Sequence, residues 1–132
     1  MTAASTVEDT TLADIESARA RIAGGVVRTP CVHSPSLSRI TGCEVFVKLE
    51  YQQRTGSFKE RGARNALLQL SEDARRRGVT AASAGNHALA LAWHGRDLGI
   101  PVTVVMPKIA PHSICLQRCS NVMTMANSSG IS

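Results

Sequence analysis

The amino-acid sequence predicts an α/β protein with a mostly parallel sheet flanked by helices. Segments rich in β-branched residues, at 44–50, 79–82 and 102–106, alternate with helical segments at 58–77 and 86–98. The segment 102–106 (VTVVM) is almost wholly apolar, as expected for a strand buried on both faces of a parallel sheet. The order strand, helix, strand, helix, strand is typical of βαβ units.

The spacing of apolar residues, together with Gly and Pro, also predicts the elements before residue 44. Residues 1–10 are polar and are expected to form a flexible leader. A helix is expected over 12–22, where apolar residues recur at helical spacing until a Gly-Gly pair ends the pattern. Pro30 favours extended backbone before it, and a short helix is then expected to end at Gly42.

Composition excludes several classes of protein. The 132 residues are 43% apolar, which suits one globular domain and argues against disorder. The net charge of +5 comes from scattered basic residues and one run, 75–77, which suits a helix end better than a nucleic-acid surface. No segment reaches the ~20 apolar residues of a membrane span. The four cysteines and the absence of a signal peptide predict a cytoplasmic protein.

The segment 55–63 (TGSFKERGA) places Lys59 at the start of a helix. Ser57 and Glu60 have the spacing of a capping box, which makes Ser57 the N-cap and Lys59 the second helical residue. Amides of the first turn carry partial positive charge, which favours an uncharged amine there. An uncharged lysine attacks carbonyls to form Schiff bases. Alternatively, Lys59 extends into solvent without a role, at a cost of ~0.3 to 1 kcal/mol.

The rest of this helix contains a glycine and an apolar stripe. Gly62 costs about 1 kcal/mol relative to Ala unless a close neighbour needs the space. Glu60 and Arg64 are expected to pair on the exposed side. The buried stripe is expected to consist of Ala63, Ala66, Leu67 and Leu70.

The segment 83–87 (SAGNH) lies between a strand and an apolar helix. Gly85 and its small neighbours allow a sharp turn and the close approach of a ligand, at which the helix directs free amides. A substrate carboxylate suits this place, and Ser83 and Asn86 can add hydrogen bonds. The alternative is an ordinary turn with Ser83 or Asn86 as the helix cap. His94, further along this helix, is expected to be a packing or helix-end residue.

Together, the segments 49–70 (LEYQQRTGSFKERGARNALLQL) and 81–92 (AASAGNHALALA) resemble the fold-type-II pyridoxal-phosphate enzymes. Within them, the chain is similar to the threonine/serine dehydratase (threonine ammonia-lyase) and serine racemase branch over roughly residues 15–111. The resemblance implies a tryptophan-synthase-β-like fold. Residues 11–119 would form the N-terminal portion of the catalytic domain, followed by a divergent tail at 120–132 without clear periodicity.

The resemblance also implies roles for individual residues. Lys59 would hold pyridoxal 5'-phosphate as a Schiff base, with Phe58 near the cofactor ring and Asn86 bonded to its phenolic oxygen. The substrate carboxylate would lie in the turn formed by Ser83, Ala84, Gly85, Asn86 and His87.

The implied activity is β-elimination of water from L-threonine or L-serine, which gives a 2-oxo acid and ammonia, with Lys59 taking the α-proton. Enzymes similar to serine racemase carry a second serine where this chain has Ala84, so elimination is expected rather than racemisation. The resemblance further implies a role in amino-acid metabolism, such as isoleucine biosynthesis. It also implies a homo-oligomer that acts on a small amino acid and binds neither nucleic acid nor membrane.

The chain departs from this family in length and in its last residues. Family members are more than twice as long, and their glycine-rich phosphate loop and the polar side chain at the pyridine nitrogen are not found here. A truncated or frameshifted reading is therefore expected, in which the isolated chain is inactive or nearly so.

Other interpretations stay open. One is a non-catalytic remnant or interaction module on the same scaffold, and another is a serine racemase-like or hydroxyaspartate dehydratase activity. No metal site is expected, although His112, Cys115 and Cys119 would share one helix face.

Overall fold

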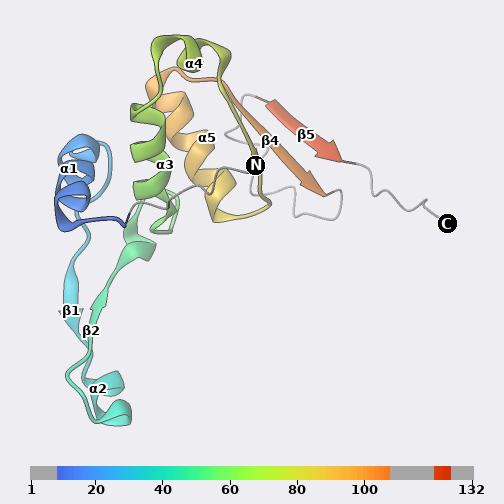
Figure 1. Ribbon diagram of the computed structural model, residues 1–132. Helices are drawn as coiled ribbons and strands as arrows, with labels where there is room; N and C mark the ends of the chain where they lie inside the picture. The colour runs from blue at the N-terminus through green and yellow to red at the C-terminus, as the bar shows by residue number, and fades with distance from the viewer. Residues whose placement is uncertain (1–8, 108–120, 126–132) are drawn as a thin grey trace, which may run out of the picture.

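The computed structural model describes residues 9–107 and, as backbone, residues 121–125. Figure 1 shows two parts, a layered body and an arm that extends away from it. In the body, α3 (Lys59–Leu68) packs on α5 (Asn86–Leu98), and α5 packs on the sheet. The arm consists of β1 (Cys31–His33), α2 (Pro35–Thr41) and β2 (Phe46–Lys48). Two further elements lie between arm and body, α1 (Leu12–Ile22), which packs on α3, and the 3-10 turn η1 (Glu50–Gln52).

The sheet of the body is parallel, which confirms the predicted α/β class. Its strands are β3 (Val79–Ala82), β4 (Val102–Pro107) and β5 (Asn121–Met125), in that order. The sequence β3, α5, β4 forms the βαβ unit that the alternation of segments predicted. The strand β5 lies within 120–132, where the sequence predicted no element.

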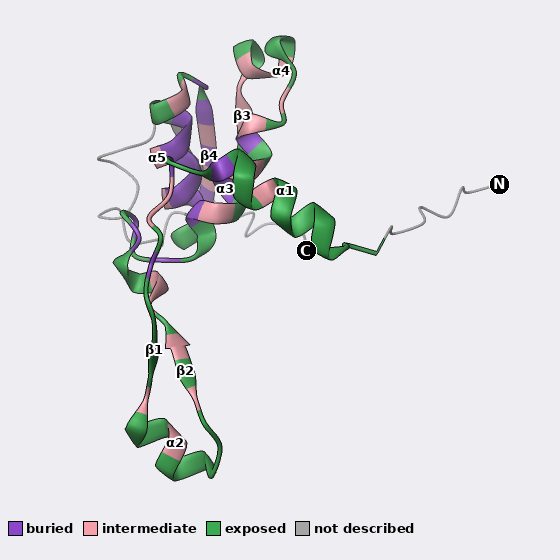
Figure 2. Ribbon diagram, turned by 90° about the vertical axis from the view of Figure 1, so that its left-hand side faces the viewer, coloured by how far each residue is buried: buried purple, intermediate pink, exposed green. Residues whose placement is uncertain are grey.

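The core lies between α3, α5 and one face of β4. Figure 2 shows the buried residues concentrated there. Val102, Val104 and Met106 are buried, whereas Thr103 and Val105 between them are only half-buried. Burial of this strand on both faces was therefore a wrong expectation for the described residues, because only one face of β4 meets α5. The core residues of the helices are Ala63, Leu67, Ala88, Ala90 and Leu91.

The predicted strand at 44–50 does not join the parallel sheet. Its central residues form β2, which pairs antiparallel with β1 in a separate two-stranded sheet. The residues of the arm are mostly exposed (Figure 2); Phe46 is 60% and Ile40 79% exposed. The alternating pattern of 44–50 identified a strand, but such a pattern does not identify the partner of a strand.

The helix predicted over 58–77 is divided into α3 and α4 (Glu72–Arg77). Ser71 caps α4, because its hydroxyl accepts a hydrogen bond from the Ala74 amide at 3.3 Å. Arg75 donates to the carbonyl oxygen of Leu68 at 2.8 Å, at the end of α3. The placement of the arginine run 75–77 at a helix end was correct.

The other sequence-predicted elements are observed within a few residues of their expected bounds. The first helix begins after Thr11, whose hydroxyl accepts from the Asp14 amide. The short helix α2 ends at Gly42, which has a positive φ of 71°. Among the described residues, no helix is both long and apolar enough to cross a membrane.

Candidate functional site

Lys59 and the 83–87 turn lie at the same end of the body. The contacts of Glu60 with His94 and of Arg64 with Asp97 show that α3 and α5 run in the same direction. Figure 1 shows both helices beginning towards the end of the sheet at which β3 and β4 finish, with the first turn of α3 beside His94, eight residues after the start of α5. Open α/β sheets bind ligands at the carboxyl ends of their strands.

Lys59 is the first residue of α3 and is exposed. Its Nζ lies 5.0 Å from the centroid of the Phe58 ring, which is itself 59% exposed. Within the described part of the chain, the Lys59 amine makes no hydrogen bond or ion pair. The amine is therefore available to an incoming group.

The predicted capping box at the start of α3 was wrong. Phe58 is the N-cap, and no side chain caps the helix, so Lys59 is the first helical residue rather than the second. Glu60 accepts a hydrogen bond from the Thr55 amide through Oε1 instead of closing back on Ser57. The cause is tertiary, because the Glu60 side chain is fully buried against α5.

The 83–87 turn presents unused backbone amides at the start of α5. The Ser83 amide donates to the Val105 carbonyl at 3.1 Å, and the Gly85 amide donates to Ser83 Oγ at 3.4 Å. The first hydrogen bond of α5 runs from Leu89 to Gly85. The amides of residues 86–88 donate to no group in the described chain, so they can bind an anion.

The side chains of this turn face different surroundings. Asn86 and His87 are exposed, and a Cβ built on Gly85 would meet no atom within 4 Å. Ala84 packs against the hydrophobic core. Neither Ser83 nor Asn86 caps the helix, since the N-cap is Gly85. Among the described residues, no hydrogen bond joins this turn to Phe58 or Lys59.

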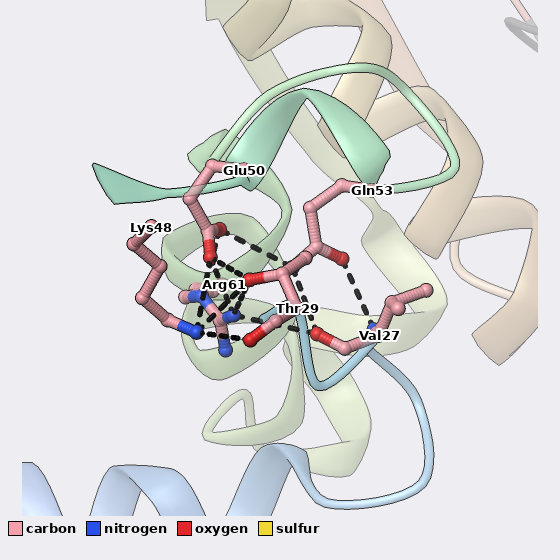
Figure 3. Close-up of polar contacts among 6 residues, drawn as sticks. All are labelled: Val27, Thr29, Lys48, Glu50, Gln53 and Arg61. Carbon is pink, nitrogen blue, oxygen red and sulfur yellow. Dashed lines mark hydrogen bonds and ion pairs between the residues drawn. The ribbon is translucent and has the colours of Figure 1, made fainter. Parts of the chain in front are cut away.

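A polar cluster fixes the segment that leads into α3 (Figure 3). Glu50 lies at its centre and receives Arg61 Nε on Oε2 at 2.9 Å and Arg61 Nη2 on Oε1 at 2.7 Å. The hydrogen bonds from Arg61 hold the pKa of Glu50 at about 2. Thr29 donates its hydroxyl to Glu50 Oε1 at 2.6 Å. The other members of the cluster are Val27, Lys48 and Gln53.

A second polar group, between α3 and α5, was not predicted from the sequence. Glu60 and His94 are fully buried, with Glu60 Oε2 and His94 Nε2 3.4 Å apart. Arg64 pairs with Asp97 at 2.6 Å, so the expected Glu60–Arg64 pair on an exposed face was wrong. The spacing contained a signal: Glu60 precedes Ala63 and Leu67 by three and seven residues, which puts it on their buried face. Ala66, expected in that stripe, is exposed, and Leu70 is partly buried.

A cavity of about 810 Å³ lies away from this site, between α1, the following segment and α3. Gly62 borders it, and a Cβ there would meet nothing within 4 Å, so close packing does not explain this glycine in the described structure. The lining does not include Lys59 or any residue of the 83–87 turn.

The described residues contain no group of three His, Cys, Asp or Glu side chains that could hold a metal ion. His112, Cys115 and Cys119, considered as ligands above, lie outside the described residues.

Comparison with known proteins assigns this arrangement to a family. Residues 22–126 match the family model described as "Pyridoxal-phosphate dependent enzyme". Three relatives are similar over 102 or 103 residues: L-threonine ammonia-lyase of Thermotoga maritima (50% identical), a putative threonine dehydratase of Sinorhizobium fredii (51%) and the catabolic L-threonine dehydratase TdcB of Staphylococcus aureus (48%). They match 77–78% of this chain, which spans only 26%, 31% and 30% of their lengths. The family match continues past residue 111, where the resemblance was expected to end.

Solved structures show the same similarity. Maize serine racemase superposes with a TM-score of 0.77 at 37% identity, over 87% of this chain and 36% of its own. A threonine deaminase, that of T.th., gives a TM-score of 0.65 at 39% identity, over 74% of this chain and 32% of its own. These similarities confirm the predicted fold type.

Proposed function

Because the chain belongs to the family of pyridoxal-phosphate dependent enzymes, we propose that Lys59 holds the aldehyde of that cofactor and that residues 83–87 receive the carboxylate of a hydroxyl amino acid. The single observation that carries this proposal is the exposed amine of Lys59, which makes no hydrogen bond or ion pair with a described residue, towards the sheet end where the amides of residues 86–88 also have no hydrogen-bond partner. An amine can form a Schiff base with the cofactor aldehyde, and free amides at a helix start can bind a carboxylate.

The residues present fit the aldehyde, the ring face and the phenolic oxygen of the cofactor. The exposed Phe58 ring offers an apolar surface beside the Lys59 amine, and the exposed Asn86 amide can bond a phenolic oxygen. Gly85 leaves open space at the turn. When bound, the cofactor withdraws electrons from the α-carbon of the amino acid.

The chain's own residues would then orient the substrate and move one proton. The free amides and the positive end of α5 bind the substrate carboxylate, which fixes the α-carbon. The Lys59 amine removes the α-proton as a general base. Loss of the β-hydroxyl as water and hydrolytic release of ammonia convert threonine or serine into a 2-oxo acid. Three relatives with 48–51% identity bear threonine ammonia-lyase or dehydratase names, one of them catabolic, which supports threonine as the substrate.

Elimination is favoured over racemisation by Ala84. Racemisation needs a proton donor on the face of the α-carbon opposite the base, and the Ala84 methyl, packed against the core, has no proton to give. A serine racemase-like activity remains the second candidate because of the similarity to maize serine racemase.

The cofactor role of Lys59 is tested by trapping. The chain is incubated with pyridoxal 5'-phosphate, reduced with borohydride, digested and mapped by mass spectrometry. We expect the pyridoxyl group on Lys59, and its loss from that peptide in Lys59→Arg. A label that is absent, or that lies on Lys48 instead, contradicts the proposal and supports a non-catalytic module.

The reaction is tested in a chimera. Residues 22–126 replace the matching segment of the Thermotoga maritima L-threonine ammonia-lyase, and release of 2-oxo acid from threonine and serine is measured. We expect threonine deamination, and none when the chimera carries Lys59→Ala. Racemisation of serine faster than deamination of threonine would overturn the choice between the two activities.

A further inference from the structure

We propose that Glu60 and His94 form a buried polar link that fixes Lys59 relative to the 83–87 turn. Both are then positioning residues, since neither is exposed to a ligand. This inference rests on the role proposed for Lys59. It accounts for the placement of a carboxylate and an imidazole, each 0% exposed, beside the apolar core between α3 and α5.

Glu60 ties together the backbone on both sides of Lys59. It is the next residue along α3, and its Oε1 accepts the Thr55 amide, four residues before Lys59. Its other oxygen, Oε2, faces His94 on α5. The loop before the helix, the first helical turn and α5 therefore meet at one carboxylate.

Arg64 determines which ring nitrogen of His94 carries the proton. Arg64 Nη1 lies 3.2 Å from His94 Nδ1, and a guanidinium can only donate. Nδ1 must therefore accept, which leaves the proton of the neutral ring on Nε2, facing Glu60. Burial lowers the pKa of His94, and the charge of Arg64 lowers it further, against the opposing charges of Glu60 and Asp97. The neutral ring therefore presents its Nε2–H toward Glu60 Oε2 at 3.4 Å, although neither atom completes a hydrogen bond among the described residues.

The link reaches the turn through α5. His94 and Asn86 belong to the same helix, about 12 Å apart at 1.5 Å per residue. Arg64 and Asp97 add a second tie between the two helices at 2.6 Å. Helices joined at two levels cannot slide or rotate past one another without breaking a contact, so the start of α3 keeps its place relative to the start of α5.

Three variants separate positioning from packing. In Glu60→Gln, a side-chain NH₂ faces either the Thr55 amide or His94 Nε2–H, so one donor is always set against another. His94→Leu keeps an apolar side chain of moderate size but leaves Glu60 Oε2 facing no polar group from α5, while the Thr55 amide still donates to Oε1. His94→Gln can accept from Arg64 and present an N–H toward Glu60, so it retains the polar groups that the imidazole offers to both neighbours.

The full chain is incubated with pyridoxal 5'-phosphate as the probe and reduced with borohydride. The measured quantity is the ratio of the pyridoxyl group on Lys59 to that on Lys48. Lys48 serves as the internal reference, and the chain in urea gives the ratio without structure. Circular dichroism and thermal melts establish the temperature at which each variant is folded. We expect wild type and His94→Gln to share a high ratio. Glu60→Gln and His94→Leu should lower it by about tenfold.

The outcomes distinguish the two proposals. A wild-type ratio equal to that in urea refutes the role of Lys59 itself, before any variant is compared. A wild-type preference for Lys59 that persists in folded Glu60→Gln or His94→Leu refutes only the positioning link. Loss of the preference in folded His94→Gln refutes it as well, because the hydrogen-bond pattern is then not what matters. Should Glu60→Gln not fold, the two His94 variants decide.

Discussion

Lys48 and Lys59, the two lysines in the described part of the chain, differ in what surrounds their amines. Lys48 Nζ donates to the Thr29 carbonyl at 2.7 Å and to the Thr29 hydroxyl at 2.9 Å, and lies 3.7 Å from Glu50. Lys59 Nζ lies over the Phe58 ring and makes no hydrogen bond or ion pair with a described residue. The first amine is engaged in structure, while the second is open to the role proposed for it.

With the role proposed for Lys59, this contrast would separate stability from function within a short segment. The segment from Lys48 to Arg61 contains both the ion pair Glu50–Arg61 and the Lys59 amine, which makes no ion pair with a described residue. Arg61, two residues after Lys59, holds α3 to the preceding segment through Glu50. The fold can therefore leave Lys59 unpaired, because its neighbours in sequence make the contacts.

The largest effect is expected from Glu50→Gln, which removes the charge at the centre of the polar cluster. Arg61 and Lys48 would lose their carboxylate partner, and we expect the free energy of unfolding to fall by about 2–3 kcal/mol. Urea denaturation followed by circular dichroism measures this. The released Lys48 should also take more pyridoxyl label, which would weaken the contrast between the two lysines.

Glu44→Gln is the matched control, since Glu44 is exposed and makes no hydrogen bond or ion pair among the described residues. We expect a change within about 0.5 kcal/mol. Equal losses in the two variants would show that the polar cluster does not hold the arm and α3 together.

The pH dependence of stability provides a second test of the same cluster. The pKa of Glu50 is about 2 in the folded chain, below its ordinary value near 4.5, because Arg61 donates to the carboxylate. The folded state therefore binds this proton less readily than the unfolded state. The stabilisation is complete above about pH 4.5 and is lost as the pH falls toward about 2. Urea titrations across that window should show the gap between wild type and Glu50→Gln closing; a gap independent of pH would contradict the assignment.

Local patterns in the sequence predicted the helices, strands and helix ends that are determined by residues close together in the chain. The βαβ unit of β3, α5 and β4 follows from apolar segments of the correct length, and Gly42 and the 75–77 run marked helix ends. Lys59 and the 83–87 turn could be singled out for the same reason, because each lies at a helix start that the sequence defines.

Features that depend on distant partners could not be predicted in this way. The strand at 46–48 was identified, but its antiparallel partner at 31–33 is too short to show a pattern. Glu60 fitted a local capping box, yet a contact with His94, 34 residues along the chain, fixes its side chain. Ser71 begins a new helix where the apolar spacing continues, because its hydroxyl offers the backbone a local alternative.

A smaller effect is expected from Lys48→Met, which keeps most of the apolar stem and removes the amine. Two hydrogen bonds to Thr29 are lost, but the side chain is 47% exposed, so water replaces part of them. We expect the free energy of unfolding to fall by about 1 kcal/mol. An unchanged unfolding midpoint in urea would mean that the amine of Lys48 is as free as that of Lys59.

The smallest change in stability is expected from Lys59→Met, although it should abolish labelling at that position. Removing an ammonium from the first turn relieves its repulsion by the helix amides, worth about 0.3–1 kcal/mol. The same change removes the contact with the Phe58 ring, worth about 0.5–1 kcal/mol at an exposed site. The two effects oppose one another, so the free energy of unfolding should stay within about 0.5 kcal/mol of wild type. A loss as large as that of Lys48→Met would show that Lys59 is a structural residue, and the two lysines would then no longer differ in kind.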